Sequence, residues 1–162
     1  MPLSLTLFFL PGASSQWPAA YSGNLVCYVR GKKANDKGII MIGYITLGTN
    51  DLPRAAKFYD ALLVTIGAKR LMEFEKAIVW GVSPTSPGLC ATAPFDGKPA
   101  SVGNGVMVAL AVDSKAKVDA FYKKALELGG KDEGPAGPRG DNFYAGYFRD
   151  LDGNKLCAFF SG

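Results

Sequence analysis

The chain has 162 residues and a net charge of +4, and 48% of its residues are hydrophobic while 20% are charged. This length suits one domain with a sizeable core, and this composition excludes a disordered chain or a coiled coil. Because the sequence contains no histidine, it cannot form a Ser-His-Asp triad, a His-ligated zinc site or a two-His-one-carboxylate iron site. It also lacks a basic stripe interleaved with aromatic residues, so we expect no nucleic-acid partner.

Residues 1–40 differ from the rest and are expected to form an N-terminal extension. Residues 3–10 are an apolar run that ends at Pro11-Gly12, and eight residues are too few to span a bilayer, so no membrane contact is expected. A secretory signal would place basic residues before this run, and none is present. We therefore favour an extra strand, paired in a β-hairpin with residues 25–30, or an interface segment.

A regular pattern begins at Met41 and predicts a strand over residues 42–47. Thr49, Asn50 and Asp51 are typical helix-capping residues, and Pro53 is typical of the first helical turn. Apolar residues then recur at helical spacing until the helix ends at Gly67. Three further strands are expected at residues 68–73, 77–82 and 89–93.

The second half repeats this order of elements. Residues 105–112 predict a strand, Asp113 or Ser114 a helix cap, and residues 118–126 an amphipathic helix. Shifted by 63 positions, residues 44–47 lie over residues 107–110. Shifted by 67 positions, Trp80 lies over Tyr147, and Leu89-Cys90-Ala91 lies over Leu156-Cys157-Ala158. The chain is therefore expected to contain two βαβββ modules.

Two turn-forming segments lie in the second module. Asp150 to Asn154 resembles a calcium loop, but Ser161 stands where such a loop needs glutamate, so we predict a hairpin turn. Residues 133–143 are rich in Gly and Pro and carry Arg139 and Asp141. They predict a loop that either covers a pocket or serves as an ordinary surface connection.

The duplicated pattern resembles the vicinal oxygen chelate superfamily, which includes glyoxalase I, bleomycin-resistance proteins, fosfomycin-resistance enzymes and extradiol dioxygenases. The resemblance rests on ITLGTNDLPRAAKFYDALL (45–63), VALAVDSKAKVDAFY (108–122) and FRDLDGNKLCAF (148–159). It implies an α+β domain over residues 41–162, with modules at about 41–95 and 104–162. In this fold the tandem βαβββ modules form two cupped mixed sheets around a central cavity.

Metal-dependent members of the superfamily take their ligands, commonly His and Glu, from four strand positions. The resemblance assigns these positions to Tyr44, Cys90, Met107 and Cys157. None of them carries the carboxylate or imidazole donor that a hard divalent metal needs. We therefore expect a branch that lacks the usual metal ligands and uses no metal and no cofactor. Two thiols and a thioether suit a soft metal such as Cu(I), but Cys and Met are also common core residues.

The cysteines Cys27, Cys90 and Cys157 are an odd number at wide spacing. They predict free thiols in a reducing compartment, and we expect a cytoplasmic protein. A thiol nucleophile is the other possibility, although no activating partner stands beside either cavity cysteine in the sequence.

The expected pocket is lined by aromatic and sulfur-containing residues: Tyr44, Trp80, Cys90, Met107, Tyr147 and Cys157. This lining predicts a metal-independent protein that binds a small apolar or aromatic ligand, for example to sequester an antibiotic. Trp80 and Tyr147 are expected to stack on a planar or cationic ligand. The alternative is a lyase- or isomerase-like enzyme that uses a pocket Tyr, a thiol or a carboxylate, from Glu73, Glu75 or Asp141. A third possibility is a structural protein with filled cups. Because each module leaves an open sheet edge, we also expect a homodimer.

Overall fold

The computed structural model describes residues 41–162. These residues belong to one compact unit. The strands, hairpin and Cys27 expected within residues 1–40 lie outside the described residues. No helix in the described range is long and apolar enough to cross a bilayer.

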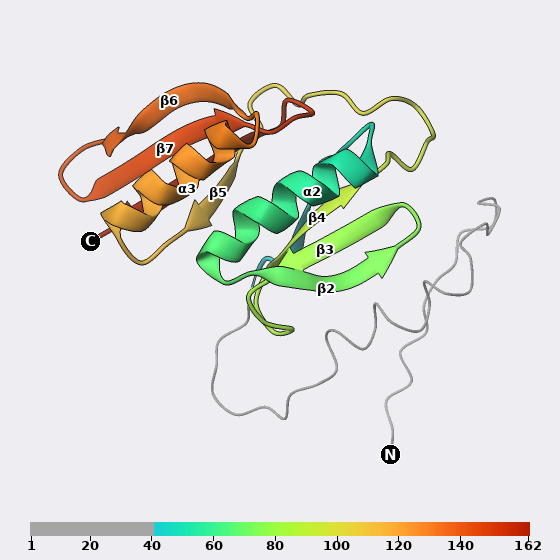
Figure 1. The fold of residues 1–162 in the computed structure, drawn as a ribbon, viewed down its shortest axis with the longest axis horizontal. Coiled ribbons are helices and arrows are strands. Elements are labelled where there is room, and N and C mark those ends of the chain that lie inside the picture. Colours follow the sequence, from blue (N-terminus) through green and yellow to red (C-terminus); the bar gives the residue numbers. More distant parts are fainter. Residues whose placement is uncertain (1–40) are drawn as a thin grey trace, which may run out of the picture. The chain divides into compact units, whose positions relative to one another are not determined.

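Both modules have the order strand, helix, strand, strand, strand (Figure 1). The first comprises β1 (Tyr44–Gly48), α2 (Leu52–Leu63), the 3₁₀ turn η1 (Val64–Ile66), β2 (Lys69–Phe74), β3 (Ala77–Gly81) and β4 (Gly88–Thr92). The second comprises β5 (Val108–Ala111), α3 (Lys115–Glu127), β6 (Lys131–Pro138), β7 (Phe143–Arg149) and β8 (Lys155–Ser161). The α+β fold with tandem βαβββ modules is therefore confirmed.

Each module forms one four-stranded mixed sheet. The strand orders are β1-β4-β3-β2 and β5-β8-β7-β6. In both sheets the first strand pairs in parallel with the last, and the remaining pairs are antiparallel. The helix that follows the first strand supplies the crossover that this parallel pairing requires.

The internal repeat is visible in the strand register. Ile45 pairs with Leu89 in the first sheet, and Val108 pairs with Leu156 in the second. These pairs are related by the shifts of 63 and 67 positions that the sequence indicated. The alignment of the first and last strands of the two modules, β1 with β5 and β4 with β8, is therefore correct.

The third strand of each module departs from that alignment by one residue. Trp80 pairs with Leu89, whereas the counterpart of Leu89, Leu156, pairs with Phe148. Trp80 therefore corresponds to Phe148 and not to Tyr147. The cause is loop length, because six residues (82–87) join β3 to β4 while five (150–154) join β7 to β8. A shift of one residue along a strand moves a side chain to the opposite face of the sheet.

The helices begin where polar caps were expected. The Asp51 carboxylate accepts a hydrogen bond from the backbone N of Arg54 at 2.9 Å, and the Ser114 hydroxyl accepts one from Lys117 N at 3.3 Å. These side chains satisfy amide groups that have no partner within the helix. After α2 and its 3₁₀ turn, Gly67 adopts a left-handed conformation with φ of 79°, which glycine accepts without steric cost.

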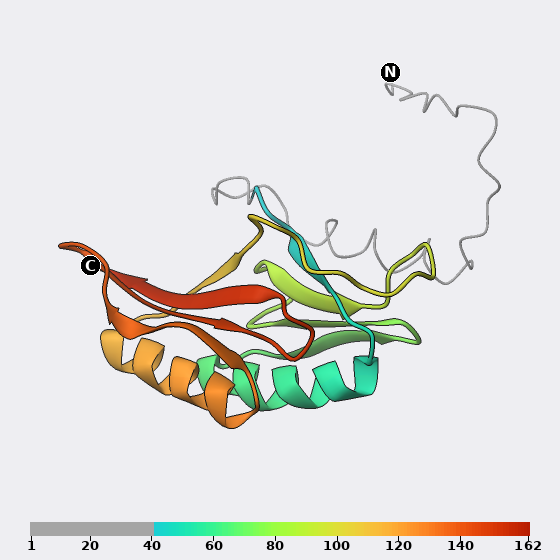
Figure 2. The same cartoon turned by 90° about the horizontal axis from the view of Figure 1, so that it is seen from above.

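The main core lies between the strands and the two helices, which cover the same side of the sheets (Figure 2). Its aromatic contacts repeat in the two modules. The ring centroids of Tyr59 and Trp80 are 5.4 Å apart, and those of Phe121 and Phe148 are 6.0 Å apart. Each pair joins a helix to the third strand of its own module.

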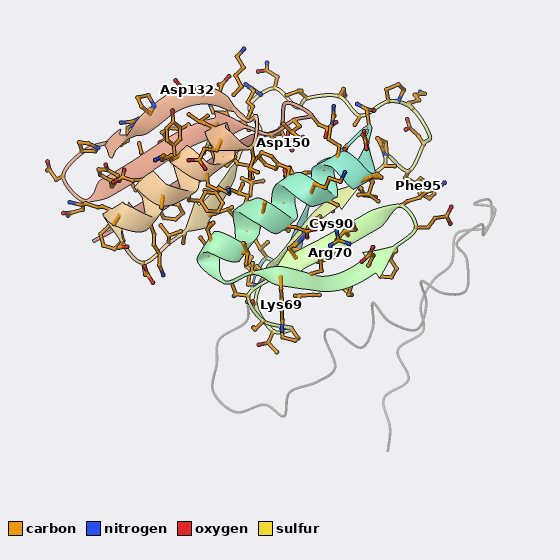
Figure 3. The ribbon with its side chains drawn as sticks, in the orientation of Figure 1. Lys69, Arg70, Cys90, Phe95, Asp132 and Asp150 are labelled. Atoms are coloured by element: carbon orange, nitrogen blue, oxygen red, sulfur yellow. The ribbon has the colours of Figure 1, made fainter. Side chains whose placement is uncertain are left out.

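The turn between β7 and β8 fastens the second module to the first. Asp150 lies in this turn (Figure 3). Its buried carboxylate accepts a hydrogen bond from the Tyr59 hydroxyl of α2 at 2.6 Å. Asp152 accepts hydrogen bonds from the Thr49 hydroxyl at 2.7 Å and from the Arg54 guanidinium at 2.9 Å. The Asn154 amide donates to the Gly48 carbonyl at 2.9 Å. The hairpin turn predicted here is present, and it also forms the junction between modules.

Tyr59 makes the stability of this junction sensitive to alkaline pH. Burial, followed by the nearby Asp150 charge, raises the Tyr59 pKa well above its ordinary value of 10.0. A group whose pKa is raised by folding contributes stability below its unfolded pKa and loses it as the pH rises beyond that value. We expect the free energy of unfolding to fall steeply above about pH 10 and to fall less steeply in Tyr59→Phe, as measured by urea titrations. A Tyr59→Phe slope equal to that of the parent would contradict this assignment.

One predicted loop is largely a strand. Residues 133–143 were expected to form a Gly/Pro-rich loop, but residues 131–138 belong to β6. The β6–β7 register contains two irregularities in the part of β6 that carries the glycines and prolines. β6 is also the outermost strand of its sheet, where proline is tolerated. Only the hairpin tip, with Arg139 and Asp141, remains outside regular structure.

Candidate ligand-binding faces

We call the side of each sheet that faces away from the helices its open face (Figure 2). On the first sheet this face carries a small apolar cluster, separate from the main core, formed by Ala77, Val79 and Cys90 with Met72 and Phe74 packed against it. The alternation along each strand separates the two faces. Leu89 and Ala91 pack in the main core, while Cys90 between them belongs to the open-face cluster.

Five of the six predicted pocket residues lie on the open sides of the strands. Tyr44 alternates with the core residue Ile45 and is 54% exposed. Cys157 and Tyr147 face each other across β8 and β7 and alternate with core residues of those strands. Met107 immediately precedes the core residue Val108 and is 42% exposed. A cavity enclosed between the two open faces remains a prediction.

Trp80 is the exception, and its assignment to the pocket is corrected here. Its side chain is 1% exposed and packs beneath α2 against Tyr59. The indole N–H donates a hydrogen bond to the Asp60 carboxylate at 2.8 Å. Because the longer β3–β4 loop shifts the register by one residue, Trp80 points toward the helix and cannot stack on a ligand on the open face.

The residues at the four superfamily ligand positions do not fit a hard divalent metal. Cys90 and Cys157 are free and buried, and burial raises the pKa of each thiol above its ordinary value. Neutral thiols, a phenol and a thioether offer poor donors to a cation that prefers carboxylate or imidazole. Residues 41–162 contain no group of three or more His, Cys, Asp or Glu side chains arranged to hold a metal ion.

The same raised pKa disfavours a nucleophilic role for either cysteine. The reactive species is the thiolate, which forms readily only where the pKa is lowered. The Lys155 charge offsets part of the effect of burial at Cys157, but the direction remains upward. Both cysteines therefore have the character of packed, protonated side chains.

A polar cluster on the open face of the second sheet was not predicted as a whole. Glu133 on β6 accepts hydrogen bonds from Arg149 Nε at 2.7 Å and from Lys155 Nζ at 3.2 Å. Lys155 Nζ lies 5.8 Å from the centre of the Tyr147 ring, and the Arg139 guanidinium lies 5.4 Å from it. Alternation of Arg149 and Lys155 with the core residues of β7 and β8 was the available signal in the sequence.

The first sheet has no such cluster at the corresponding positions. The register equates Val79 with Tyr147, Gly81 with Arg149 and Gly88 with Lys155. The two open faces therefore differ in chemistry, one being apolar and the other basic with an aromatic ring.

The carboxylates considered for proton transfer lie elsewhere. Glu73 binds Arg70 at 2.8 Å, and Arg70 also binds Asp60 of α2 at 2.6 Å. Glu75 is in the turn between β2 and β3, and Asp141 is at the β6–β7 hairpin tip. A surface depression of about 340 Å³ adjoins the start of α3, lined by Ile66, Val82, Ala111, Val112, Asp113 and Lys117. None of the predicted pocket residues lines it.

Comparison with known proteins agrees with this fold. Residues 41–158 match the model of the Glyoxalase/Bleomycin resistance protein/Dioxygenase superfamily. The chain therefore belongs to that superfamily. No curated protein sequence matches it.

Three solved structures illustrate the similarity. A glyoxalase/bleomycin resistance protein from Albidiferax ferrireducens T118 is 35% identical, with a TM-score of 0.68, over 74% of this chain and 97% of that one. Fosfomycin resistance protein FosX from Listeria monocytogenes, complexed with Mn(II) and sulfate, is 17% identical, with a TM-score of 0.57, over 77% and 93%. Lactoylglutathione lyase from Agrobacterium tumefaciens is 20% identical, with a TM-score of 0.57, over 76% and 95%. The latter two show the shared fold alone.

Proposed function

We propose that the chain is a metal-independent small-molecule-binding protein whose ligand lies on the open faces of its sheets. The observation that carries this proposal is the identity of the residues at the four ligand positions. Tyr44, Cys90, Met107 and Cys157 replace metal donors with apolar and weakly polar groups, which suit contact with an organic ligand. The protein then holds its ligand, in the manner of a sequestering protein, without changing it.

A lyase- or isomerase-like activity is the second candidate. One observation favours it, namely the position of the Tyr147 ring close to both Lys155 and Arg139. A phenol beside cations is a reasonable group for proton transfer. Recovery of unchanged ligand after prolonged incubation would separate binding from this alternative.

We also propose that the protein is a cytoplasmic homodimer. Buried free thiols at Cys90 and Cys157 suit a reducing compartment. Within residues 41–162, β1 and β2 leave the edges of the first sheet unpaired, and β5 and β6 leave those of the second. Unpaired edges and exposed apolar side chains such as Tyr44 and Met107 are commonly covered by a partner surface. Light scattering of the full chain at micromolar concentration tests this, and a monomer would contradict it.

Metal independence leads to a direct prediction. Protein purified without chelator should contain no stoichiometric zinc, nickel, manganese or iron by elemental analysis. A thermal-shift screen of small organic compounds should find ligands that raise Tm in proportion to the logarithm of their concentration above Kd. The same shifts should appear after treatment with EDTA. One equivalent of bound metal, or loss of ligand binding with EDTA, would contradict the proposal.

A further inference from the structure

We propose that the open face of the second sheet binds the anionic group, a carboxylate or a phosphate, of the protein's small-molecule ligand. This inference rests on the proposed function, because it assigns a chemical class to the ligand of that same site. It also changes the expectation drawn from the sequence, which was a small apolar or aromatic molecule, planar or cationic.

The first argument is the local charge. Three cationic side chains, Arg139, Arg149 and Lys155, surround Tyr147 and its strand neighbours, and Glu133 is the carboxylate that pairs with two of them. Hydrogen bonds from Arg149 and Lys155 lower the Glu133 pKa, so it carries its full negative charge near neutral pH. The cluster therefore keeps a net charge of +2. Arg149, Lys155 and Glu133 are half-buried, whereas Arg139 is exposed. An anion beside the half-buried cations is attracted more strongly than in open water.

The second argument is the way in which Arg139 is held. Its Nη1 donates to the Pro138 carbonyl at 3.0 Å and its Nη2 donates to the Pro135 carbonyl at 2.6 Å. A Cβ atom at Gly137 would lie 3.3 Å from Arg139 Nη1, which is tighter than ordinary contact, so the absence of a side chain there lets the guanidinium lie close over β6.

Neither hydrogen-bond partner of Arg139 is an acid. Asp141, two residues away, is not a partner in either of these hydrogen bonds. A guanidinium has five N–H donors, so Arg139 retains donors for an oxyanion. Its carbonyl contacts fix the side chain before the ligand arrives, and such preorganisation lowers the entropic cost of binding.

The third argument is the difference between the two modules. Where the second sheet carries Arg149 and Lys155, the first carries Gly81 and Gly88. The first module folds with an apolar open face, so the fold itself does not require charged side chains at these positions. Arg149 and Lys155 do bind Glu133 of β6, but Arg139 makes no such ion pair within residues 41–162. The excess of positive charge points to an anionic partner.

The test uses probes that share one aromatic ring and differ in charge. Benzoate and phenyl phosphate are the anionic probes, benzyl alcohol is the neutral probe, and benzylamine is the cationic probe. Binding to the full chain is followed by NMR titration, with the backbone amides of β7 and β8 as reporters. At least one of the two anions should bind at least about tenfold more tightly than the neutral probe, since charge-assisted hydrogen bonds contribute about 1.5–3 kcal/mol. The stronger of the two anions identifies carboxylate or phosphate as the natural group.

Variants test whether the preference for anions arises from the basic cluster around Tyr147. Arg139→Gln should weaken the anion by about tenfold and leave the neutral probe unchanged, and Arg139→Lys should restore only part of the affinity because it lacks the planar fork. Lys123→Gln removes the same charge from the exposed surface of α3 and should have no effect. Raising the salt concentration should weaken the anions selectively.

The outcomes separate this inference from the proposed function. Equal binding of all four probes on the open faces, unaffected by Arg139→Gln, would overturn the anion site while leaving a small-molecule-binding protein. Shifts that follow Lys123→Gln as strongly as Arg139→Gln would show nonspecific attraction and would also overturn it. Failure of every probe, and of a wider compound screen, to perturb the open faces would overturn both.

Discussion

Replacing Trp80 with alanine is expected to lower the free energy of unfolding by about 4 kcal/mol, the upper part of the range for large-to-small changes at buried aromatic positions. Trp80 is 1% exposed and packs against Tyr59, so its removal leaves a cavity under α2. It also removes one of the donors to Asp60, whose pKa is lowered by hydrogen bonds from Arg70 and from Trp80. Denaturant unfolding at neutral pH gives the measurement.

Matched variants distinguish packing from ligand contact. Trp80→Phe should retain most of the packing and lose chiefly the hydrogen bond, at a cost of about 1–2 kcal/mol. Tyr147→Ala, on the open face, should change stability much less than Trp80→Ala but should weaken ligand binding. If Trp80→Phe folds normally and yet loses the ligand, Trp80 would be a pocket residue after all and its placement in the core would be wrong.

Replacing Asp150 with alanine is expected to lower the free energy of unfolding by about 3 kcal/mol, since it deprives one buried and three partly buried donors of a charged acceptor. The carboxylate accepts from the Tyr59 hydroxyl at 2.6 Å, from the Asn154 side chain at 2.8 Å and from two backbone amides of its own turn. The loss therefore affects both the turn and the contact between modules. Calorimetry or chemical unfolding measures it, and the unfolding transition is expected to shift as a whole.

A double-mutant cycle isolates the contact between modules. Asp150→Asn and Tyr59→Phe should be strongly non-additive, because they share one hydrogen bond. The exposed hydrogen bond from Tyr122 to Asp132, at 2.9 Å, provides the control. Asp132→Asn should cost much less, since water can replace its partner. Additive effects for the buried pair would show that the junction does not depend on this contact.

The sequence was most informative where structure is determined locally or by the repeat. Asp51, Ser114 and Gly67 lie at the helix ends that their chemistry predicts. The shifts of 63 and 67 positions correspond to the observed pairing of β1 with β4 and β5 with β8. These features depend on backbone capping and on the pattern of apolar residues, both of which can be recognised in a single sequence.

The errors arose where one residue or one edge changed the geometry. The face predicted for Trp80 is wrong because the loop of residues 82–87 is one residue longer than its counterpart. Side chains alternate along a strand, so a shift of one residue places the side chain on the opposite face of the sheet. The glycines and prolines of β6 predict a loop, but they are tolerated in a strand at the edge of a sheet. The contact of Arg139 with Tyr147 depends on that edge strand, so the basic cluster was recognised only in part.

The parallel pairing of first and last strands has a consequence for the order of folding during synthesis. In the first module, β1 has no neighbour until β4, whose register begins with Gly88 opposite Tyr44. The contact at the end of β1, a hydrogen bond from the Asn154 side chain to the Gly48 carbonyl, can form only after residue 154 has been synthesised. Contacts so distant along the chain are slow to form. A ribosome-bound chain that ends shortly before Asp150 should therefore remain open to proteases, and release of the last strand should complete folding in a single step.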